Sequence, residues 1–214
     1  MPVHAADATI RLAETHPRCE VLGPGIRFAV WVQGCPLHCA ECTSPAWIPE
    51  VGGVEVGVGE LADRIADQAI DGLTLSGGEP FAQAAELADL VARVRARRDL
   101  SVMSYTGYVL EHLRRHGDAA QHRLLDALDI LVDGPYLANR HARLRWRGSA
   151  NQRLHYLTGR HRPLPDDDSA GLQIELGADG AIRWLGVPAV RQFRVEFERR
   201  LGLAPAPDAV PLAE

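Results

Sequence analysis

Short apolar segments with the composition of strands alternate with amphipathic helical segments along most of this chain. The strand-like segments are residues 27–32, 73–75, 100–105 and 130–132. The helical segments are residues 60–70, residues 83–97, a stretch carrying Leu110 and Leu113, and a stretch carrying Leu124, Leu125 and Leu128. This alternation predicts parallel strands joined by right-handed helical crossovers. We therefore expect an α/β fold with its functional groups just past the C-terminal ends of the strands.

The C-terminal part of the chain has a different pattern. Residues 172–176 and 181–187 flank a glycine-containing segment, residues 177–180, and this predicts a hairpin with a four-residue loop. Residues 190–201 have the character of a closing helix, whereas residues 163–171 and the tail from residue 204 resemble linkers. With 214 residues, the chain has the length of one domain, 1–214. We place its core at about 20–155, a C-terminal extension at about 156–203 and a tail at 204–214.

Composition and charge exclude several classes of function. Hydrophobic residues make up 46% and charged residues 24%, as in folded globular proteins. No apolar run reaches the ~18 residues of a membrane span, and the first residues lack the basic start and apolar core of a secretory signal. The net charge of −5 argues against binding of nucleic acid by bulk charge. Every basic side chain except histidine is arginine, which excludes a lysine Schiff base, lysine-dependent pyridoxal phosphate chemistry and a P-loop.

Three of the four cysteines, Cys35, Cys39 and Cys42, fall within eight residues directly after the first strand-like segment. Such a short loop can direct three thiolates at one metal centre, and this clustering favours a reduced, cytoplasmic protein over a disulfide scaffold. A structural zinc site needs a fourth ligand, for which His38 and Cys19 are candidates. A cubane iron–sulfur cluster held by three cysteines has one iron open to an outside ligand. Cys19 outside the cluster is expected to be an ordinary core or surface residue.

The motifs at the strand ends resemble those of the radical S-adenosylmethionine superfamily. The cysteine motif is followed, after the next strand-like segment, by Ser76-Gly77-Gly78-Glu79-Pro80. One branch is more similar still, the activating enzymes of anaerobic ribonucleotide reductase, which are glycyl-radical-enzyme activases. The segments that carry this closer resemblance are residues 23–27, 73–81, 105–108, 131–135 and 147–153. The resemblance implies an incomplete (β/α)6-type radical S-adenosylmethionine barrel of about six strands, with the C-terminal hairpin and helix added to it.

The resemblance also implies cofactors and residue roles. Cys35, Cys39 and Cys42 would hold a [4Fe–4S] cluster. The glycine-rich motif, residues 76–79, would bind the methionine amino group of S-adenosylmethionine, with Ser76, Gly77, Gly78 and Glu79 as the cofactor-binding residues. Ser104, Thr106 and Asp133, past two later strands, would also contact the cofactor. For Asp133, a capping role in the turn before Gly134 is an equally good interpretation. No catalytic side chain is identified.

The implied reaction is reductive cleavage of S-adenosylmethionine to a 5′-deoxyadenosyl radical, which then abstracts hydrogen. The chain would be a radical S-adenosylmethionine oxidoreductase that draws electrons from a donor such as flavodoxin or ferredoxin and acts on a glycyl-radical protein. A second hypothesis is hydrogen abstraction from a peptide or small molecule in a biosynthetic pathway. A third is a zinc-stabilised binding module without enzymatic activity.

Residues 140–162 contain seven arginines and no acidic residue, with Trp146 and Tyr156 between them. Such a stripe can bind a carboxylate, an acidic peptide or a phosphorylated substrate. It can also be a solvated face, since Asp166, Asp167 and Asp168 follow it directly. We expect Arg145, Arg147 and Arg153 to face the open mouth of the barrel and to contact the substrate there, which would make them determinants of specificity.

Overall fold

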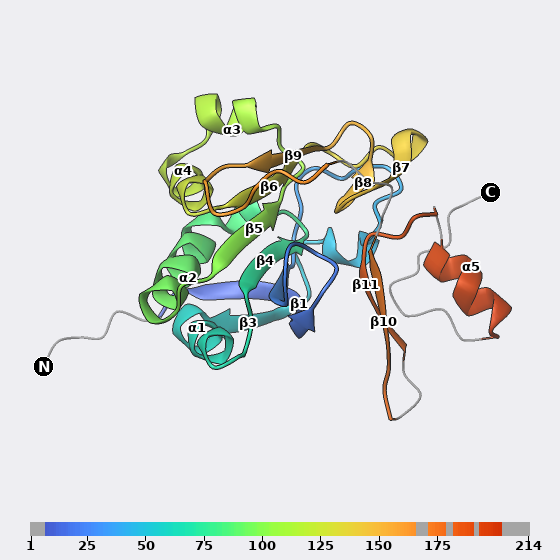
Figure 1. Cartoon of the computed structure of the whole chain (residues 1–214), viewed down its shortest axis with the longest axis horizontal. Coiled ribbons are helices and arrows are strands. Elements are labelled where there is room, and N and C mark those ends of the chain that lie inside the picture. Colours follow the sequence, from blue (N-terminus) through green and yellow to red (C-terminus); the bar gives the residue numbers. More distant parts are fainter. Residues whose placement is uncertain (1–6, 166–170, 179–181, 191–192, 203–214) are drawn as a thin grey trace, which may run out of the picture.

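The chain folds around one seven-stranded mixed sheet, seen in the computed structural model of Figure 1, which describes residues 7–165, 171–178, 182–190 and 193–202. The strand order is β3-β1-β2-β4-β5-β6-β9, and two smaller sheets pair β7 with β8 and β10 with β11. The strands are β1 Thr9–Cys19, β2 Arg27–Val32, β3 Val54–Gly57, β4 Gly72–Gly77, β5 Ser101–Tyr105, β6 Ile130–Asp133, β7 His141–Leu144, β8 Arg147–Ser149, β9 Arg153–Tyr156, β10 Leu172–Leu176 and β11 Ile182–Gly186.

The α-helices that precede β6 in the chain lie on one face of the sheet, whereas the last α-helix lies beside the C-terminal hairpin (Figure 1). The α-helices are α1 Val58–Ala66, α2 Ala84–Arg97, α3 Leu110–His116, α4 Ala119–Asp126 and α5 Phe193–Arg200, and the short 3-10 helices are η1 Pro45–Trp47, η2 Pro80–Gln83 and η3 Ala138–Arg140. None of the helices within the described ranges combines the length and the apolar character needed to cross a bilayer.

The four strands predicted from the sequence form the parallel centre of the sheet. β2 pairs in parallel with β4, β4 with β5, and β5 with β6. The outer strands were not predicted: β1 runs antiparallel to both β2 and β3, and β9 runs antiparallel to β6. β9 has the polar sequence Arg-Leu-His-Tyr, so its pairing depends on the neighbouring strand rather than on its own composition. The parallel portion is thus four strands wide, fewer than the six expected.

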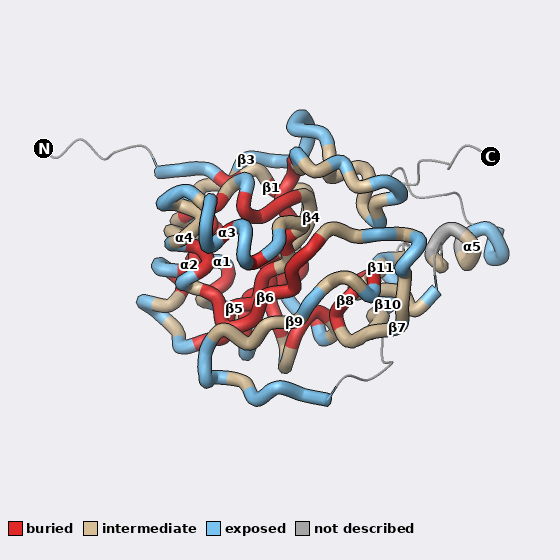
Figure 2. Tube along the Cα trace, turned by 90° about the horizontal axis from the view of Figure 1, so that it is seen from above, coloured by how far each residue is buried: buried red, intermediate tan, exposed pale blue. Residues whose placement is uncertain are grey.

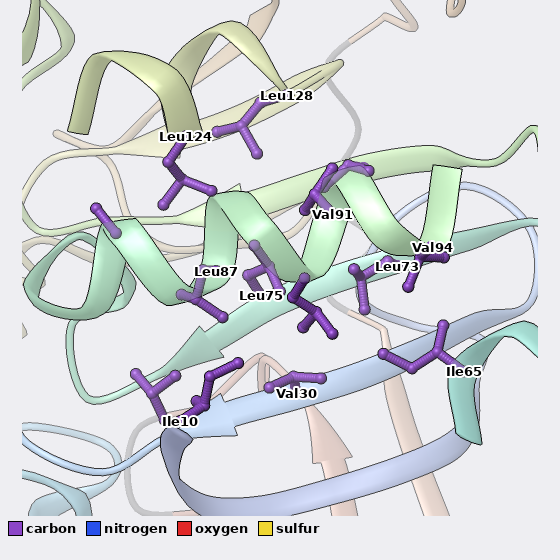
Figure 3. Packing of buried hydrophobic residues seen from close by; sticks show 14 of the residues in the cluster. Ile10, Val30, Ile65, Leu73, Leu75, Leu87, Val91, Val94, Leu124 and Leu128 are labelled. Carbon is purple, nitrogen blue, oxygen red and sulfur yellow. The ribbon is translucent and has the colours of Figure 1, made fainter. Parts of the chain in front are cut away.

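The main hydrophobic core lies between the sheet and the helices. Alternate residues of β2, Phe28, Val30 and Val32, point to this side and are buried with Leu73 and Leu75 of β4. Figure 3 shows Leu87, Val91 and Val94 of α2 lying over these strands, with Ile65 of α1 and Leu124 of α4 at the sides. The core residues are fully or almost fully buried, and Figure 2 shows the buried segments in red at the centre of the fold. This packing fixes the parallel strands and therefore their C-terminal ends.

The other face of the sheet is covered partly by the C-terminal hairpin. β10 and β11 pair antiparallel over five residue pairs, so the predicted hairpin is confirmed, although turn residues 179–181 lie outside the described ranges. Leu185 of β11 is 3% exposed and packs with Cys19, Leu22 and Trp31. The predicted closing helix is also confirmed as α5, which begins later than expected. Residues 166–170 of the expected linker and the tail from residue 203 are likewise outside the described residues.

Arg27 is fully buried on this second face, and all its N–H groups have acceptors. Its Nε donates to Thr74 Oγ1 at 2.6 Å, and Nη1 donates to Ser101 Oγ at 2.8 Å and to the Pro24 carbonyl at 3.0 Å. Its Nη2 donates to the carbonyl oxygens of Leu73 at 2.7 Å and of Ser101 at 3.2 Å. Burial lowers the pKa of Arg27 to about 10, so the side chain is still a cation at neutral pH. Arg27 therefore joins β2, β4 and β5 through hydrogen bonds to neutral oxygens.

Changing Arg27 to Met is expected to lower the free energy of unfolding by at least about 3 kcal/mol. Each hydrogen bond to a charged group contributes roughly 1.5–3 kcal/mol, and the buried oxygens would have no replacement donor. Denaturant unfolding measures the loss, with Arg18→Met as the control because Arg18 is exposed and pairs with exposed Glu20. A loss below about 1 kcal/mol for Arg27→Met would contradict the bracing role.

Candidate functional site

The cysteine loop, residues 35–47, begins where β2 ends and is closed at its base by backbone hydrogen bonds. The Gly34 N–H donates to the Trp47 carbonyl at 2.9 Å, and the Cys35 N–H donates to the Ile48 carbonyl at 2.9 Å. Trp47 also packs beside Trp31 of β2, with ring centroids 5.9 Å apart. The loop is therefore held at both of its ends to the C-terminal end of a central strand.

Within the cysteine loop, two turns bring the thiols to the same region. His38 and Glu41 adopt positive φ angles of 45° and 55°, so the backbone reverses between successive cysteines. All three thiols are half-buried. The Ser44 N–H donates to Cys42 Sγ at 3.4 Å, a contact that favours a thiolate at this position.

The three thiols lie close enough for their charges to interact. Burial raises the pKa of Cys35 and of Cys42, and the neighbouring thiols raise it further. Bound metal would offset this repulsion, because a coordinating thiol is deprotonated. Among the described residues, no three His, Cys, Asp or Glu side chains surround a single ion. A cubane does not need that arrangement, because it presents several irons to its cysteine ligands. The donor set of three clustered thiols therefore fits an iron–sulfur cluster.

The glycine-rich motif at the end of β4 lies directly against the start of the cysteine loop. The Gly78 N–H donates to the Val32 carbonyl at 2.7 Å, and the Glu79 N–H donates to the Gly34 carbonyl at 2.9 Å. Gly77 has a φ of +105°, and a Cβ atom on it would lie 2.4 Å from the Val32 nitrogen. A Cβ on Gly78 would lie only 2.1 Å from the Gly34 oxygen. Both glycines are thus required by the approach of two backbone segments, whatever ligand the motif binds.

Glu79 is buried and links the ends of β4 and β5. Its Oε1 accepts hydrogen bonds from the Phe81 N–H at 2.9 Å and from Thr106 Oγ1 at 2.8 Å. Its Oε2 accepts from the Gly107 N–H at 2.8 Å. Gly107 in turn lies against Leu37 of the cysteine loop, because a Cβ on Gly107 would be 2.4 Å from Leu37 Cδ1. The carboxyl group of Glu79 thus braces the loops on which the site depends.

Glu79→Gln is expected to change the pH dependence of stability. Burial raises the pKa of Glu79 to about 7 from 4.5, so the folded protein binds a proton that the unfolded chain has released between these values. Stability contributed at this position is therefore lost as the pH rises from about 4.5 to 7, by up to about 3 kcal/mol. Glutamine does not titrate, so the variant should gain stability relative to wild type between pH 5 and pH 8. Denaturant unfolding at both pH values measures this gain. If the free energies of unfolding of the variant and of wild type differ by the same amount at pH 5 and at pH 8, the prediction is contradicted.

Asp133 at the end of β6 belongs to a separate cluster. Its Oδ2 accepts a hydrogen bond from the Leu110 N–H at 2.6 Å, at the start of α3. Its Oδ1 accepts from Arg153 Nε at 3.0 Å and lies 3.1 Å from His155 Nε2. Burial opposes ionisation of Asp133, but hydrogen bonds from Arg153 and Leu110 lower its pKa overall. Of the two interpretations of Asp133, this geometry favours a capping and pairing role over direct contact with the cofactor.

The other predicted cofactor residues are divided between the site and the interior. Thr106 is in the site through its bond to Glu79, and its Oγ1 also accepts from the Tyr108 N–H at 3.1 Å. Ser76 is half-buried beside Trp31 at the end of β4. Ser104 is fully buried and donates to the Tyr105 carbonyl at 3.0 Å. The contact of Ser104 with the cofactor stays a prediction, and in this structure its hydroxyl is satisfied by its own backbone neighbour.

The three arginines expected at the mouth of the barrel have different environments. Arg153 donates to Glu111 Oε1 at 2.9 Å as well as to Asp133, so its charge is used within the chain. Arg147 is 8% exposed and is buried in β8. The guanidinium carbon of Arg145 lies 5.8 Å from the centre of the Trp146 ring. Arg153 thus has structural partners within the chain, and its contact with a substrate stays a prediction.

Several residues of the site were not identified from the sequence. Gly34 contacts the glycine-rich motif, and Leu37 contacts Gly107. The carbonyl groups of Trp47 and Ile48 accept the hydrogen bonds that close the cysteine loop. The only local signal was their position within or beside the motifs, since each acts through contact with a distant segment.

Comparison with known proteins supports the iron–sulfur interpretation. The family of 4Fe-4S single cluster domains matches residues 21–155. The anaerobic ribonucleoside-triphosphate reductase-activating protein of Enterobacteria phage T4 is 36% identical over 140 residues, which are 63% of this chain and 86% of that protein. The protein of the same name from Vibrio cholerae is 35% identical over 154 residues, 67% of this chain and 96% of that protein.

A relative with a different name is also similar. The pyruvate formate-lyase-activating enzyme of Clostridium pasteurianum is 31% identical over 121 residues, 52% of this chain and 50% of that enzyme. The match to the cluster domain contains all three clustered cysteines and every strand of the parallel centre. The chain belongs to the family of anaerobic ribonucleoside-triphosphate reductase-activating proteins, within the 4Fe-4S single cluster domains.

Proposed function

We propose that this protein is a radical S-adenosylmethionine enzyme that activates a glycyl-radical enzyme. It is an enzyme of the activating type, as its relatives are. The observation that carries the proposal is the joining of two motifs at one edge of the sheet. The cysteine loop and the glycine-rich motif are hydrogen-bonded to each other through Gly34 and Glu79. A cluster held by the loop would therefore lie beside any ligand bound by the motif.

We propose that Cys35, Cys39 and Cys42 hold a [4Fe–4S] cluster with one iron open to the methionine end of S-adenosylmethionine. When bound, the cluster supplies the electron for reductive cleavage of S-adenosylmethionine to a 5′-deoxyadenosyl radical. Backbone hydrogen bonds close the base of the loop that carries these thiols. Ser44 contributes a backbone N–H toward Cys42 Sγ. The chain's work is binding, orientation and exclusion of water around this chemistry.

The glycine-rich motif is proposed to bind the methionine amino group through its backbone carbonyls and through Ser76. The carboxyl group of Glu79 already accepts three hydrogen bonds from the chain, so we assign it the positioning of this backbone. Thr106 shares that positioning role. The four parallel strands that carry these loops are compatible with an incomplete radical S-adenosylmethionine barrel, which is the architecture we propose.

The proposed partner is an anaerobic ribonucleoside-triphosphate reductase, in which the enzyme would generate a glycyl radical. The names of the relatives from phage T4 and Vibrio cholerae support this choice. The proposed source of electrons is a flavodoxin or a ferredoxin.

Anaerobic reconstitution tests the proposal. The loaded protein should contain about four irons and four sulfides per chain. After reduction with dithionite, it should convert S-adenosylmethionine to 5′-deoxyadenosine and methionine, detected by chromatography. Stoichiometric zinc without sulfide would instead support the binding-module hypothesis.

A second step identifies the target. Addition of the anaerobic ribonucleoside-triphosphate reductase of the same organism should produce a glycyl radical, detected by electron paramagnetic resonance. Release of 5′-deoxyadenosine without that radical would favour a peptide or small-molecule substrate.

A further inference from the structure

The segment between β5 and α3 connects the cysteine loop with an exposed surface. Gly107 lies against Leu37, which stands between Cys35 and Cys39. Tyr108 follows directly, and its carbonyl accepts a hydrogen bond from the Gly134 N–H at 2.9 Å. Burial raises the pKa of Tyr108, and the charges of Glu79 and Cys35 raise it further. Tyr108 is therefore a near neighbour of the proposed cluster.

A row of three neighbouring rings runs from this point to α3, with the first pair stacked and the second pair tilted by 45°. The rings of Tyr108 and His112 are 6.0 Å apart and nearly parallel, with an interplanar angle of 12°. The rings of His112 and His116 are 5.1 Å apart. The spacing of four residues places His112 and His116 on one side of α3, whereas Tyr108 lies two residues before the helix begins. His112 and His116 are exposed, so the row of rings begins next to Gly107 and ends at the surface.

The same helix carries positive charge. Arg114 and Arg115 are exposed, and neither has an ion-pair partner among the residues that the structure describes. Two acidic groups lie nearby in the chain: Glu111 pairs with Arg153 at 2.6 Å, and Asp118 caps α4 by accepting hydrogen bonds from its first N–H groups. The chain as a whole has a net charge of −5, so this surface opposes the overall charge. Figure 1 shows α3 projecting from the body of the protein beside β9 and β6.

We propose that the surface of α3 formed by His112, Arg114, Arg115 and His116 is the docking site for an acidic protein that carries a one-electron redox centre. The inference rests on the proposed function and adds the place where the electron enters. One electron leaves a reduced flavin of the partner and enters the oxidised cluster, so the flavin is oxidised by one electron and the cluster is reduced by one. Complementary charge steers the two proteins together.

The test compares a protein donor with a small chemical reductant. Reduction of the cluster is followed by the loss of its visible absorbance after mixing with reduced flavodoxin or with dithionite. The double variant Arg114→Glu, Arg115→Glu should react with flavodoxin at least tenfold more slowly at low ionic strength, and the difference should shrink as salt is added. With dithionite, which does not dock, the variant should react at the wild-type rate.

A matched control has the same change in charge elsewhere. Arg18 on β1 and Arg64 on α1 are exposed, so Arg18→Glu, Arg64→Glu should react with flavodoxin within about twofold of wild type. Calorimetry with oxidised flavodoxin measures docking without electron transfer, and the α3 variant should bind at least tenfold more weakly. A milder variant, Arg114→Gln, Arg115→Gln, removes the charge without introducing repulsion and should give an intermediate effect.

Wild-type flavodoxin rates and affinity in the α3 variants would overturn the docking proposal. Equal slowing of the flavodoxin and dithionite reactions would also overturn it, because α3 would then act on the cluster itself. Failure of the wild-type protein to cleave S-adenosylmethionine with dithionite would count against the proposed function and not against the docking surface.

Discussion

Changing Cys35, Cys39 or Cys42 to Ala, one at a time, is expected to abolish reductive cleavage of S-adenosylmethionine. Three thiolates are the whole protein contribution to the proposed cluster, and the loop offers no fourth cysteine as a substitute. Activity should fall by at least about 1000-fold, since the chemistry belongs to the cofactor. Iron and sulfide analysis after anaerobic reconstitution, together with the yield of 5′-deoxyadenosine, measures the result.

Cys19→Ala is the matched control. Cys19 is the last residue of β1 and is fully buried, in a cluster with Leu22 and Trp31. Removing its sulfur should cost about 1 kcal/mol of stability and leave the iron content unchanged. A variant of the cysteine loop that keeps full activity, or a Cys19→Ala protein that loses its cluster, would contradict the assignment.

Gly78→Val is expected to prevent cluster assembly as well as binding of S-adenosylmethionine. The sequence alone suggests a narrower effect, in which the cluster still assembles and only the cofactor is excluded. The structure predicts the wider effect because a Cβ at this position would lie 2.1 Å from the Gly34 oxygen, and backbone at both positions has little room to move. The loop that begins at Cys35 would be displaced. Iron content per chain should fall severalfold below wild type.

The control for this change is Gly159→Ala, since a Cβ on Gly159 has no atom within 4 Å. Its cluster content and affinity for S-adenosylmethionine should match wild type. Calorimetry under nitrogen separates the two effects of Gly78→Val. A Gly78→Val protein with full cluster content and no affinity for S-adenosylmethionine would contradict this prediction. Gly78 would then act only through contact with the ligand.

Local patterns were sufficient to predict the parallel centre of this fold. The strand-like segment 27–32 coincides with β2, and the predicted helix 83–97 differs from α2 by one residue. Each of these segments carries its own signal, because buried strands and helix faces have distinct apolar periods. The order of the motifs along the chain then placed the cysteine loop and the glycine-rich motif at one edge of the sheet.

Contacts between distant segments could not be predicted in the same way. Asp133 is an ordinary turn residue in the sequence, and only the antiparallel pairing of β9 with β6 brings Arg153 to it. Glu79 similarly gains its partners from the end of β5, 27 and 28 residues later in the chain. The arginine-rich segment was expected to contact the substrate, because a sequence shows the positive charges but not the acidic side chains that pair with them in the fold. The structure supplies the partner for Arg153, Glu111, from another element.

The C-terminal hairpin has a consequence for how the protein is made. Leu185 covers a face built by Cys19, Leu22 and Trp31, so the two sides of this contact are more than 150 residues apart in the chain. During synthesis, the earlier face leaves the ribosome first and exposes its indole and leucine side chains until β11 has emerged. Chains interrupted before residue 185 would keep that apolar face bare and would be prone to aggregation. Completion of the last quarter of the chain is therefore the step that protects the nascent protein.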